Sequence, residues 1–416
     1  MKVELEINNS PSDKARFVGW SPSPCRIRVT DPTGAISPMT KVQLESVSAA
    51  NGGAVVFRRG STGAFKSTLS LPVPSNGTSV SFFVAGRFGQ PSTRNEDVRI
   101  DASARLGPGS ALTPVGNLKL MVRVRKNAES LTAGERDRFI TALATLNNQG
   151  AGRFADFRNM HTNVSSPQAH GAPGFLPWHR AYLLDLEREL QAIDPSVALP
   201  YWRFDQPAPN LFTTDFLGTS DSNGTVQFSN ANPLQFWVTD GAQGIARGPR
   251  NNWDPTTQPG PTVATEAQTL GLGTIYADFS VMEGNPHGTA HTRWDGFIQS
   301  IGTAAKDPLF FLLHCNVDRL WAKWQRQNGR FDPAQASSYD SSPGNPVGHN
   351  LPDTMWPWNG IIVPPRPPTA PGGSMAGSPC VSAPGPQPTV QSSLDYQGAV
   401  NALSREGFDY DDVRFA

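Results

Sequence analysis

Hydrophobic and polar residues alternate over short runs in the first part of the chain, a pattern that predicts β-strands. The runs include Val3–Ile7, Cys25–Val29 and Leu118–Val124, and turn-forming clusters such as Asn51-Gly52-Gly53 separate them. About seven such strands in this length are typical of a small antiparallel sandwich. We therefore predict an N-terminal antiparallel β-sandwich-like domain over residues 1–125. It would serve packing or oligomerisation, or it would cover a functional site elsewhere in the chain.

Beyond about residue 130, hydrophobic residues recur at intervals of three and four, which predicts amphipathic helices. Thr132 and Glu135 have the spacing of a capping box that starts the first helix. Further helices are expected from Pro177, around His287–His291 and from Pro308. These elements predict a mainly α, four-helix-bundle domain over residues 126–360 with long loops, notably across 205–275.

The last part of the chain, residues 361–416, begins with a run dense in Pro and Gly and ends with aromatic and acidic residues. The Pro-rich run predicts an extended arm. The C-terminal segment is expected to dock on the body of the protein. The predicted fold class is therefore α+β, a β-sandwich domain followed by a mainly helical one.

The chain has 416 residues, with 35 Lys and Arg against 35 Asp and Glu, so its formal net charge is zero. Without a basic excess, we expect no nucleic-acid partner and no attachment to an anionic membrane. No apolar stretch approaches the roughly 20 residues that span a bilayer, and Met1–Glu6 lacks the apolar run of a secretory signal. A cytoplasmic location is expected, with secretion after removal of a signal as the alternative. Cys25, Cys315 and Cys380 are far apart, which argues against a disulfide framework.

Six of the seven histidines fall into two groups of three. The first group is His161, His170 and His179, with eight residues between successive members, and the second is His287, His291 and His314. Three neutral imidazoles per metal, twice over and without bridging carboxylates, favour copper over iron, magnesium or calcium. The pattern predicts oxygen chemistry at a copper pair in the core of the helical domain. The seventh histidine, His349, is expected in a surface loop.

Residues next to the second group narrow the interpretation. Gly288 follows His287 where a zinc protease of this spacing would carry a Glu, so the general base of that mechanism is missing. Asp318, one turn after His314, is a candidate acceptor for the second nitrogen of that imidazole. The alternative for Asp318 is an ordinary salt bridge with Arg319 at the helix surface.

Two stretches, Phe175–Tyr182 and Asp307–Trp321, resemble the two copper signatures of the tyrosinase family. This family of type-3 copper proteins includes catechol oxidases and haemocyanins. The resemblance covers about residues 127–360. It implies that the first group of histidines binds one copper and the second group binds the other. It also implies dioxygen as co-substrate and oxidation of a phenol or catechol to an ortho-quinone.

One departure from the family bears on the reaction. Gly288 stands where efficient monophenol hydroxylases of the family often carry an Asn. In those enzymes the Asn and a nearby Glu are thought to hold a water molecule together, and Glu283 could take the place of that Glu. The resemblance thus implies catalytic roles for Glu283 and Gly288, and the Gly favours a catechol oxidase. The alternative for Glu283 is that it is a solvated carboxylate at the start of a helix without a catalytic role. By family spacing, Ile301 is expected to contact the substrate at the entrance, and Phe310 to support the ligands from behind.

We therefore predict a type-3 dicopper oxidase with two copper ions as cofactors and dioxygen as co-substrate. It would oxidise o-diphenols to o-quinones and could also hydroxylate monophenols at the ortho position. An o-aminophenol oxidase and a haemocyanin-like reversible oxygen binder are the alternatives. The expected partners are a small phenolic substrate and, in a homo-oligomer, further copies of the chain.

Overall fold

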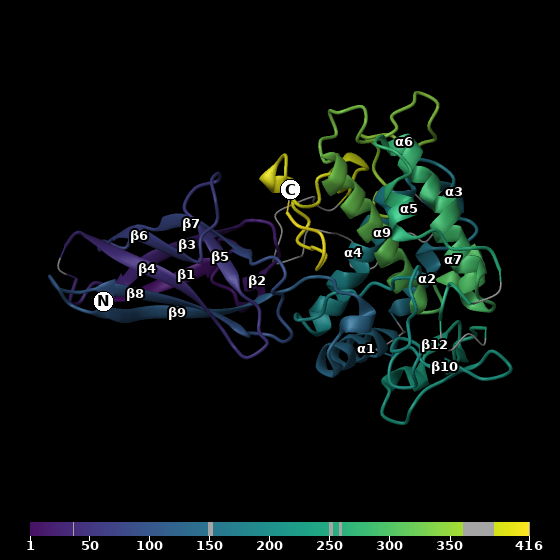
Figure 1. The fold of residues 1–416 in the computed structure, drawn as a ribbon, viewed down its shortest axis with the longest axis horizontal. Coiled ribbons are helices and arrows are strands. Elements are labelled where there is room, and N and C mark those ends of the chain that lie inside the picture. The colour runs from purple at the N-terminus through teal and green to yellow at the C-terminus, as the bar shows by residue number, and fades with distance from the viewer. Residues whose placement is uncertain (36, 149–152, 249–252, 258–259, 361–386, 416) are drawn as a thin grey trace. The chain divides into compact units, whose positions relative to one another are not determined.

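The computed structural model describes the chain except for residues 36, 149–152, 249–252, 258–259, 361–386 and 416 (Figure 1). The described residues form two compact units. The strand unit comprises Met1–Val124 and Gly407–Phe415, and the helical unit lies between Arg125 and Glu406. Strands and helices are both present, which confirms the α+β class. The predicted Pro-rich arm and Cys380 fall within 361–386, outside the described residues.

Two β-sheets make up the strand unit. One has the order β1-β3-β7-β5 and the other β2-β9-β8-β4-β6, and all pairs are antiparallel except β2 with β9. The strands are β1 Lys2–Ile7, β2 Phe17–Val18, β3 Ser23–Asp31, β4 Met39–Ser48, β5 Val55–Arg58, β6 Thr68–Pro74, β7 Val80–Gly86, β8 Val98–Arg105 and β9 Leu112–Val122. Along β3, Cys25, Ile27 and Val29 are buried while Arg26 and Arg28 are exposed. The alternation in the sequence thus directs one face of each strand into a core that both sheets share.

The last residues of the chain belong to the strand unit. Oδ2 of Asp409 accepts hydrogen bonds from the backbone N–H groups of Trp20 and Ser21, at 2.8 and 3.3 Å. The indole Nε1 of Trp20 donates to the carbonyl of Tyr410 at 2.7 Å. These buried bonds attach the C-terminal residues to the connection between β2 and β3.

Helices make up most of the regular structure of the second unit. They are α1 Ala133–Asn148, α2 Phe154–Met160, α3 Ser166–Ala169, α4 Phe175–Ile193, α5 Glu266–Leu270, α6 Tyr276–Phe279, α7 Thr289–Thr292, α8 Ile301–Ala304 and α9 Leu309–Asn328. The predicted capping box of α1 is confirmed, because Thr132 Oγ1 accepts from the N–H of Glu135 at 3.3 Å and Glu135 accepts from the N–H of Thr132 at 3.0 Å. No described helix is long and apolar enough to cross a membrane.

Two predicted helices differ from the observed ones. α4 begins at Phe175, two residues before Pro177. A proline costs no hydrogen bond there, because the first N–H groups of a helix have no intrahelical partner. The helix expected around His287–His291 is a π-helical turn, Gly284–Gly288, followed by α7, and the backbone at Asn285 is extended.

The loop region expected across 205–275 contains two pairs of short strands. These are β10 Thr219–Ser220 with β11 Val226–Gln227, and β12 Val238–Thr239 with β13 Ala242–Gln243. Each strand has only two residues, which is too short for an alternating pattern to reveal it in the sequence.

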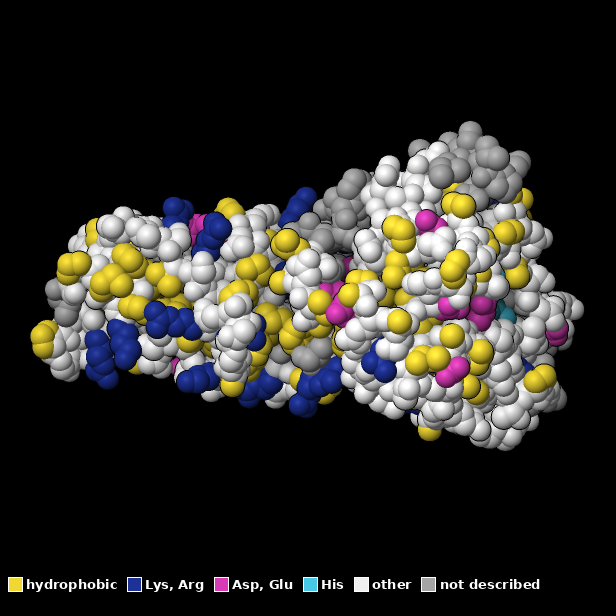
Figure 2. Space-filling model, turned by 90° about the horizontal axis from the view of Figure 1, so that it is seen from above, with side chains coloured by type: hydrophobic (Ala, Val, Ile, Leu, Met, Phe, Trp, Pro, Cys, Tyr) yellow, Lys and Arg dark blue, Asp and Glu magenta, His cyan; other side chains and the backbone are white. Residues whose placement is uncertain are grey.

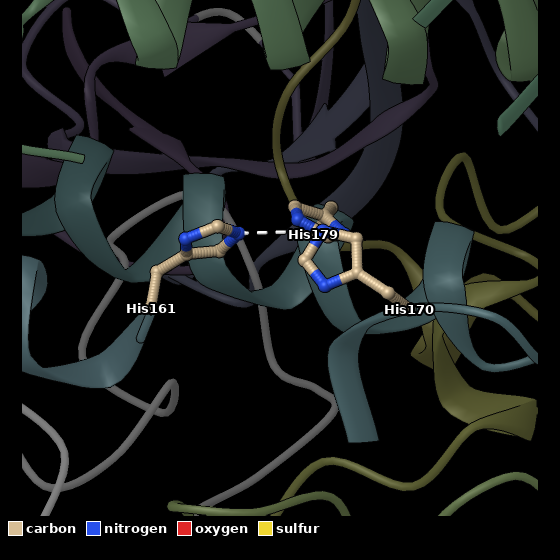
Figure 3. A group of neighbouring side chains, drawn as sticks. All are labelled: His161, His170 and His179. Carbon is tan, nitrogen blue, oxygen red and sulfur yellow. Dashed lines mark hydrogen bonds between the residues drawn. The ribbon is translucent and has the colours of Figure 1, made fainter. Parts of the chain in front are cut away.

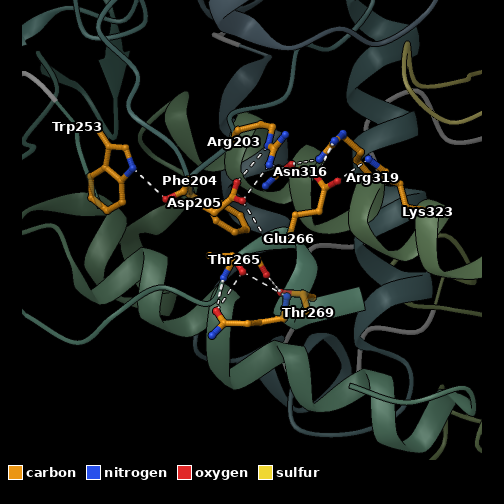
Figure 4. A network of polar contacts seen from close by, with 11 residues as sticks. Arg203, Phe204, Asp205, Trp253, Thr265, Glu266, Thr269, Asn316, Arg319 and Lys323 are labelled. Atoms are coloured by element: carbon orange, nitrogen blue, oxygen red, sulfur yellow. Dashed lines mark hydrogen bonds and ion pairs between the residues drawn. The ribbon is translucent and has the colours of Figure 1, made fainter. Parts of the chain in front are cut away.

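A network of charged side chains connects this region to α9 (Figure 4). Glu266, the first residue of α5, pairs with Arg319 at 2.8 Å and Lys323 at 2.5 Å on α9, and with Arg203 at 3.4 Å. Thr265 caps α5 through a reciprocal capping box with Gln268. The network therefore helps to fix α9, the helix that carries His314.

Charge is distributed unevenly between the two units although the chain is neutral overall. On the face seen in Figure 2, Lys and Arg side chains gather over the strand unit. Arg26, Lys41 and Lys66 are among its exposed cations. The net charge of the whole chain, zero, is therefore not the net charge of either unit taken alone.

Candidate metal centre

The two histidine triplets lie side by side in the helical unit. Within each triplet, the candidate ligand nitrogens all lie within 4.8 Å of one another. The imidazoles of the first triplet converge in Figure 3. His179 and His314, one from each triplet, stack with ring centroids 4.2 Å apart and planes 8° apart. The structure thus brings together all six histidines that the sequence predicted as ligands.

Different elements position the two triplets. His161 follows the end of α2, His170 follows the end of α3, and His179 lies in the first turns of α4. His287 belongs to the π-helical turn, His291 to α7 and His314 to the interior of α9.

Backbone carbonyls orient four of the six imidazoles. The Nδ1 atoms of His161, His179, His287 and His291 lie 3.1, 2.9, 2.7 and 2.7 Å from the carbonyl oxygens of Ile301, Phe175, Glu283 and Ile298. Because a carbonyl can only accept, each of these Nδ1 atoms carries the proton and each Nε2 carries a lone pair.

The Nε2 atoms point toward one another without ordinary partners. Nε2 of His161 lies 3.4 Å from Nε2 of His170, and Nε2 of His291 lies 3.2 Å from Nε2 of His314. The buried Nε2 atoms of His179 and His287 have no hydrogen-bond partner among the described residues. Buried imidazole lone pairs without hydrogen bonds are rare unless a cation binds them, and two sets of three neutral imidazoles fit copper.

Electrostatics keeps these imidazoles neutral. Burial lowers the pKa of His161, His179, His287 and His314 well below the usual value, and lowers the pKa of His170 and His291 to about 4. Neighbouring imidazoles lower the pKa further in all of them except His291. At neutral pH the six rings are therefore unprotonated, the form that binds a metal.

The prediction that Asp318 holds the His314 imidazole is wrong. His314 Nδ1 has no hydrogen-bond partner among the described residues. Instead, Asp318 accepts from Arg180 Nε at 2.6 Å and from Arg125 Nη1 at 3.2 Å, all three side chains being buried. Bonds between a carboxylate and two guanidinium groups are stronger than one to a neutral imidazole. Because Arg180 follows His179 in α4, Asp318 connects the two ligand-bearing helices α4 and α9. Its predicted alternative, Arg319, pairs with Glu266.

Phe310 packs directly against ligands of both triplets. Its ring centroid lies 4.2 Å from that of His314 and 4.6 Å from that of His161. An apolar ring in this place excludes water from the back of the site and limits the rotation of both imidazoles.

A cavity of about 320 Å³ adjoins the histidines. It is lined by His161, His170, Glu283, His287, Gly288, His291, Thr292, Gln299, Ile301 and Ala304. The residues predicted to act on the substrate, Glu283, Gly288 and Ile301, all lie here. Ile301 is 42% exposed, so the cavity reaches solvent at this side chain.

Glu283 is a half-buried carboxylate and not the solvated one considered as its alternative. Its Oε1 accepts a hydrogen bond from the N–H of Gly171 at 2.9 Å. Burial raises the pKa of Glu283 to about 7, and the bond from Gly171 partly offsets this rise. The carboxylate thus lies between the His170 region and the second triplet.

The seventh histidine is buried, and the prediction of a surface loop is wrong. His349 is 0% exposed. Its Nδ1 accepts from the N–H of Gly174 at 3.0 Å, and its Nε2 lies 3.1 Å from the carbonyl oxygen of Pro167. Gly348-His349-Asn350 has loop composition, and no local signal reveals burial that depends on packing against residues about 180 positions earlier.

Comparisons with known proteins agree with this geometry. The family defined as the common central domain of tyrosinase matches residues 151–327, which include both triplets. The tyrosinase of Streptomyces glaucescens is 35% identical over 267 residues, which cover 57% of this chain and 92% of that protein. Grixazone synthase of Streptomyces griseus is 31% identical over 270 residues, covering 50% of this chain and 86% of that protein. The G-type hemocyanin of Enteroctopus dofleini, units Oda to Odg, is 30% identical over 220 residues, covering 49% of this chain and 7% of that protein.

Proposed function

This chain belongs to the tyrosinase family and is a copper oxidoreductase of the tyrosinase type, and we propose that it oxidises o-diphenols to o-quinones with dioxygen as co-substrate. The convergence of six neutral imidazoles, all buried or half-buried, beside an open cavity is the observation that carries this proposal. A copper pair, when bound, supplies the site for dioxygen and accepts the electrons of the catechol. Two catechols each lose two electrons and two protons, and one dioxygen is reduced to two waters.

The chain supplies the ligands, their orientation and a place for the substrate. His161, His170 and His179 would hold one copper, and His287, His291 and His314 the other. The bonds from four Nδ1 atoms to carbonyls hold those rings in place before metal binds. A catechol in the cavity would lie between the ligands and Ile301, whose side chain we propose as a substrate contact.

Glu283 and Gly288 would act on the substrate from one side of the cavity. The Glu283 carboxylate can accept a phenolic proton as the ring approaches the ligands. Gly288 offers no side chain to hold a water next to Glu283, which supports diphenol oxidation over monophenol hydroxylation.

Substitution of Gly288 tests this preference. A Cβ at position 288 would lie 3.3 Å from the carbonyl oxygen of Glu283, a contact that a small shift relieves. We expect Gly288→Asn to raise the ratio of monophenol to o-diphenol turnover, measured as oxygen uptake by copper-loaded protein. Gly288→Ala adds the same Cβ without the amide and should leave the ratio unchanged. Equal ratios in the wild type, Gly288→Asn and Gly288→Ala would show that residue 288 does not set the preference for o-diphenols.

Oxygen uptake also separates the proposed enzyme from its alternatives. Uptake with catechol but not with a matched monophenol is the expected result. Faster uptake with o-aminophenol than with catechol would favour an o-aminophenol oxidase. Reversible oxygen binding without turnover of any phenol would indicate a carrier of the hemocyanin kind.

We also propose the finer architecture of the fold, an antiparallel β-sandwich followed by a four-helix bundle around the copper pair. The core shared by the two sheets supports the sandwich. The packing of α4 with α9 and with α1, together with ligands on α4, α7 and α9, supports the bundle.

A further inference from the structure

His170 differs from the other candidate ligands in what holds it. It lies between α3 and α4, outside both helices, and its Nδ1 has no hydrogen-bond partner among the described residues. His314 also lacks a partner at Nδ1 among the described residues, but it lies inside the long helix α9 and packs against the rings of His179 and Phe310, each 4.2 Å away by centroid. The His170 ring contacts His161, His179 and Phe175, with centroids 5.0, 5.1 and 5.8 Å away, but among the described residues no hydrogen bond at Nδ1 orients it, so its placement depends also on the backbone around it.

His349 bonds to that backbone on both sides of His170. The His170 segment, Pro167–Gly174, runs from the second residue of α3 to the residue before α4. Because the N–H of Gly174 donates to Nδ1 of His349, the proton of the neutral ring is on Nε2, which donates to the carbonyl of Pro167. Only this tautomer makes both bonds, and it fixes the two ends of the segment to a single rigid ring.

The surroundings of His349 fit this role. Tyr339 donates its hydroxyl to the carbonyl of His349 at 2.8 Å. Asp353 accepts from the backbone N–H groups of Gly348 and Asn350, at 2.8 and 3.1 Å, which fixes the turn that presents the ring. A Cβ on residue 174 would lie 2.5 Å from Nδ1 of His349, so glycine is needed for the close approach.

We propose that His349 is a positioning residue for the first copper site, which it serves by holding the His170 segment so that the His170 imidazole faces His161 and His179. This inference rests on the copper binding of the proposed function. His349 lies outside residues 151–327, the part matched by the tyrosinase central domain. It touches no candidate ligand through its two ring bonds, so its effect on the metal would pass through the His170 segment.

Copper binding by the full-length chain tests the inference. Metal-depleted protein is titrated with copper(I) against a competing chelator, and the melting temperature of the metal-free protein reports its folding. His349→Phe keeps a ring but removes both bonds, whereas His349→Asn keeps an oxygen that can accept from Gly174. We expect His349→Phe to bind one of the two copper ions about 10–100-fold more weakly and the other as the wild type does. His349→Asn should show a smaller loss at the same site.

A double-mutant comparison isolates the route through His170. In a His170→Ala background, His349→Phe should cause no further loss of affinity, because the residue it positions is already missing. Additive losses, or equal losses at both sites, would overturn the inference. Unchanged affinity in His349→Asn and in any folded His349→Phe would overturn it too. A wild-type chain that binds no copper would overturn the proposed function and this inference together, whereas the other outcomes leave the proposed function intact.

Discussion

The two histidine triplets present the same donor atoms but obtain their geometry from contacts of different range. In the second triplet, the Nδ1 partners of His287 and His291 are carbonyls four and seven residues away in the sequence. In the first triplet, the Nδ1 partner of His179 is also four residues away, but that of His161 is the carbonyl of Ile301, 140 residues away. The His170 segment is held by His349, which is 175 residues from Gly174 and 182 from Pro167.

This difference teaches that two ligands of the second site are oriented by local contacts, whereas two ligands of the first site depend on contacts across the fold. The third ligand of the second site, His314, depends on the position of α9. The turn and helix that bear His287 and His291 need few distant contacts to orient their rings. The first site needs residues near 300 and 349 in place. We therefore expect substitutions far from the chemistry to damage the first site selectively.

Removal of one of the two stacked ligands, His179 or His314, should have the largest effect on copper content and activity. Because the two rings belong to different triplets, either removal should affect both copper sites. His179 and His314 belong to different triplets but pack ring on ring. We expect His179→Ala and His314→Ala each to reduce copper content from two ions and to abolish oxygen uptake with catechol. Metal analysis and uptake on the same samples check this. Full activity in either variant would contradict the ligand assignment.

Loss of Asp318 should weaken both sites through stability. Asp318→Asn would leave Arg125 and Arg180 without their full complement of charge in a buried place, at a cost of about 3–5 kcal/mol in the free energy of unfolding. Denaturant unfolding of metal-free protein measures this cost. Asp215→Asn, an exposed carboxylate on the same unit, is the control and should change stability by less than about 0.5 kcal/mol. Selective loss of one copper site in Asp318→Asn would argue against a connection between α4 and α9.

Two glycine substitutions, one beside each site, should show whether the first copper site is the more sensitive to changes in the backbone around it. In Gly174→Ala the new Cβ would displace His349, so affinity for one copper should fall by about 10–100-fold. Gly284, beside the second triplet, has a negative φ, and a Cβ added there would meet nothing within 4 Å, so Gly284→Ala should bind both ions normally. Copper titration of the two variants decides between them. A similar loss in both would mean that the two sites are equally sensitive.

The smallest expected effect is on the pH dependence of stability and comes from Glu406, which interacts electrostatically with Arg180 of α4 and Asp318 of α9. Glu406 is buried, and burial raises its pKa to about 7 although Arg180, Arg188 and Arg125 lower it and Asp318 raises it. Because the folded state favours the protonated form, its stabilising contribution is complete below about pH 4.5 and is lost as the pH rises through about 7. Glu406→Gln should therefore make the metal-free protein about 1–3 kcal/mol more stable at pH 8 and reduce the fall of the melting temperature between pH 5 and 8. Burial also raises the pKa of Asp185 to about 7, so part of the fall in melting temperature between pH 5 and 8 should persist in Glu406→Gln. An unaltered pH dependence would show that Glu406 is ionised in the folded protein throughout this range.

Much of the centre could be predicted because its signals are local. The six histidines, the helices that carry His179 and His314, and the Thr132–Glu135 cap are all patterns of near neighbours, and the alternation over Cys25–Val29 correctly predicted the strand β3. The errors arose where a side chain had several partners in reach. Asp318 has the right spacing for His314, but two buried arginines from elsewhere in the chain compete for it.

The sequence by itself identified the six candidate ligands and, through their kinds and number, favoured copper, while its resemblance to the tyrosinase family indicated the reaction that we propose. It also determined the order of strand and helix, because hydrophobic periodicity acts between residues a few positions apart. Only the tertiary structure decided that His349 is buried, that Asp318 joins two helices, and that the C-terminal residues attach to Trp20. Those outcomes depend on contacts between residues that are distant in sequence, whose free energies are set by which other groups compete for the same buried place.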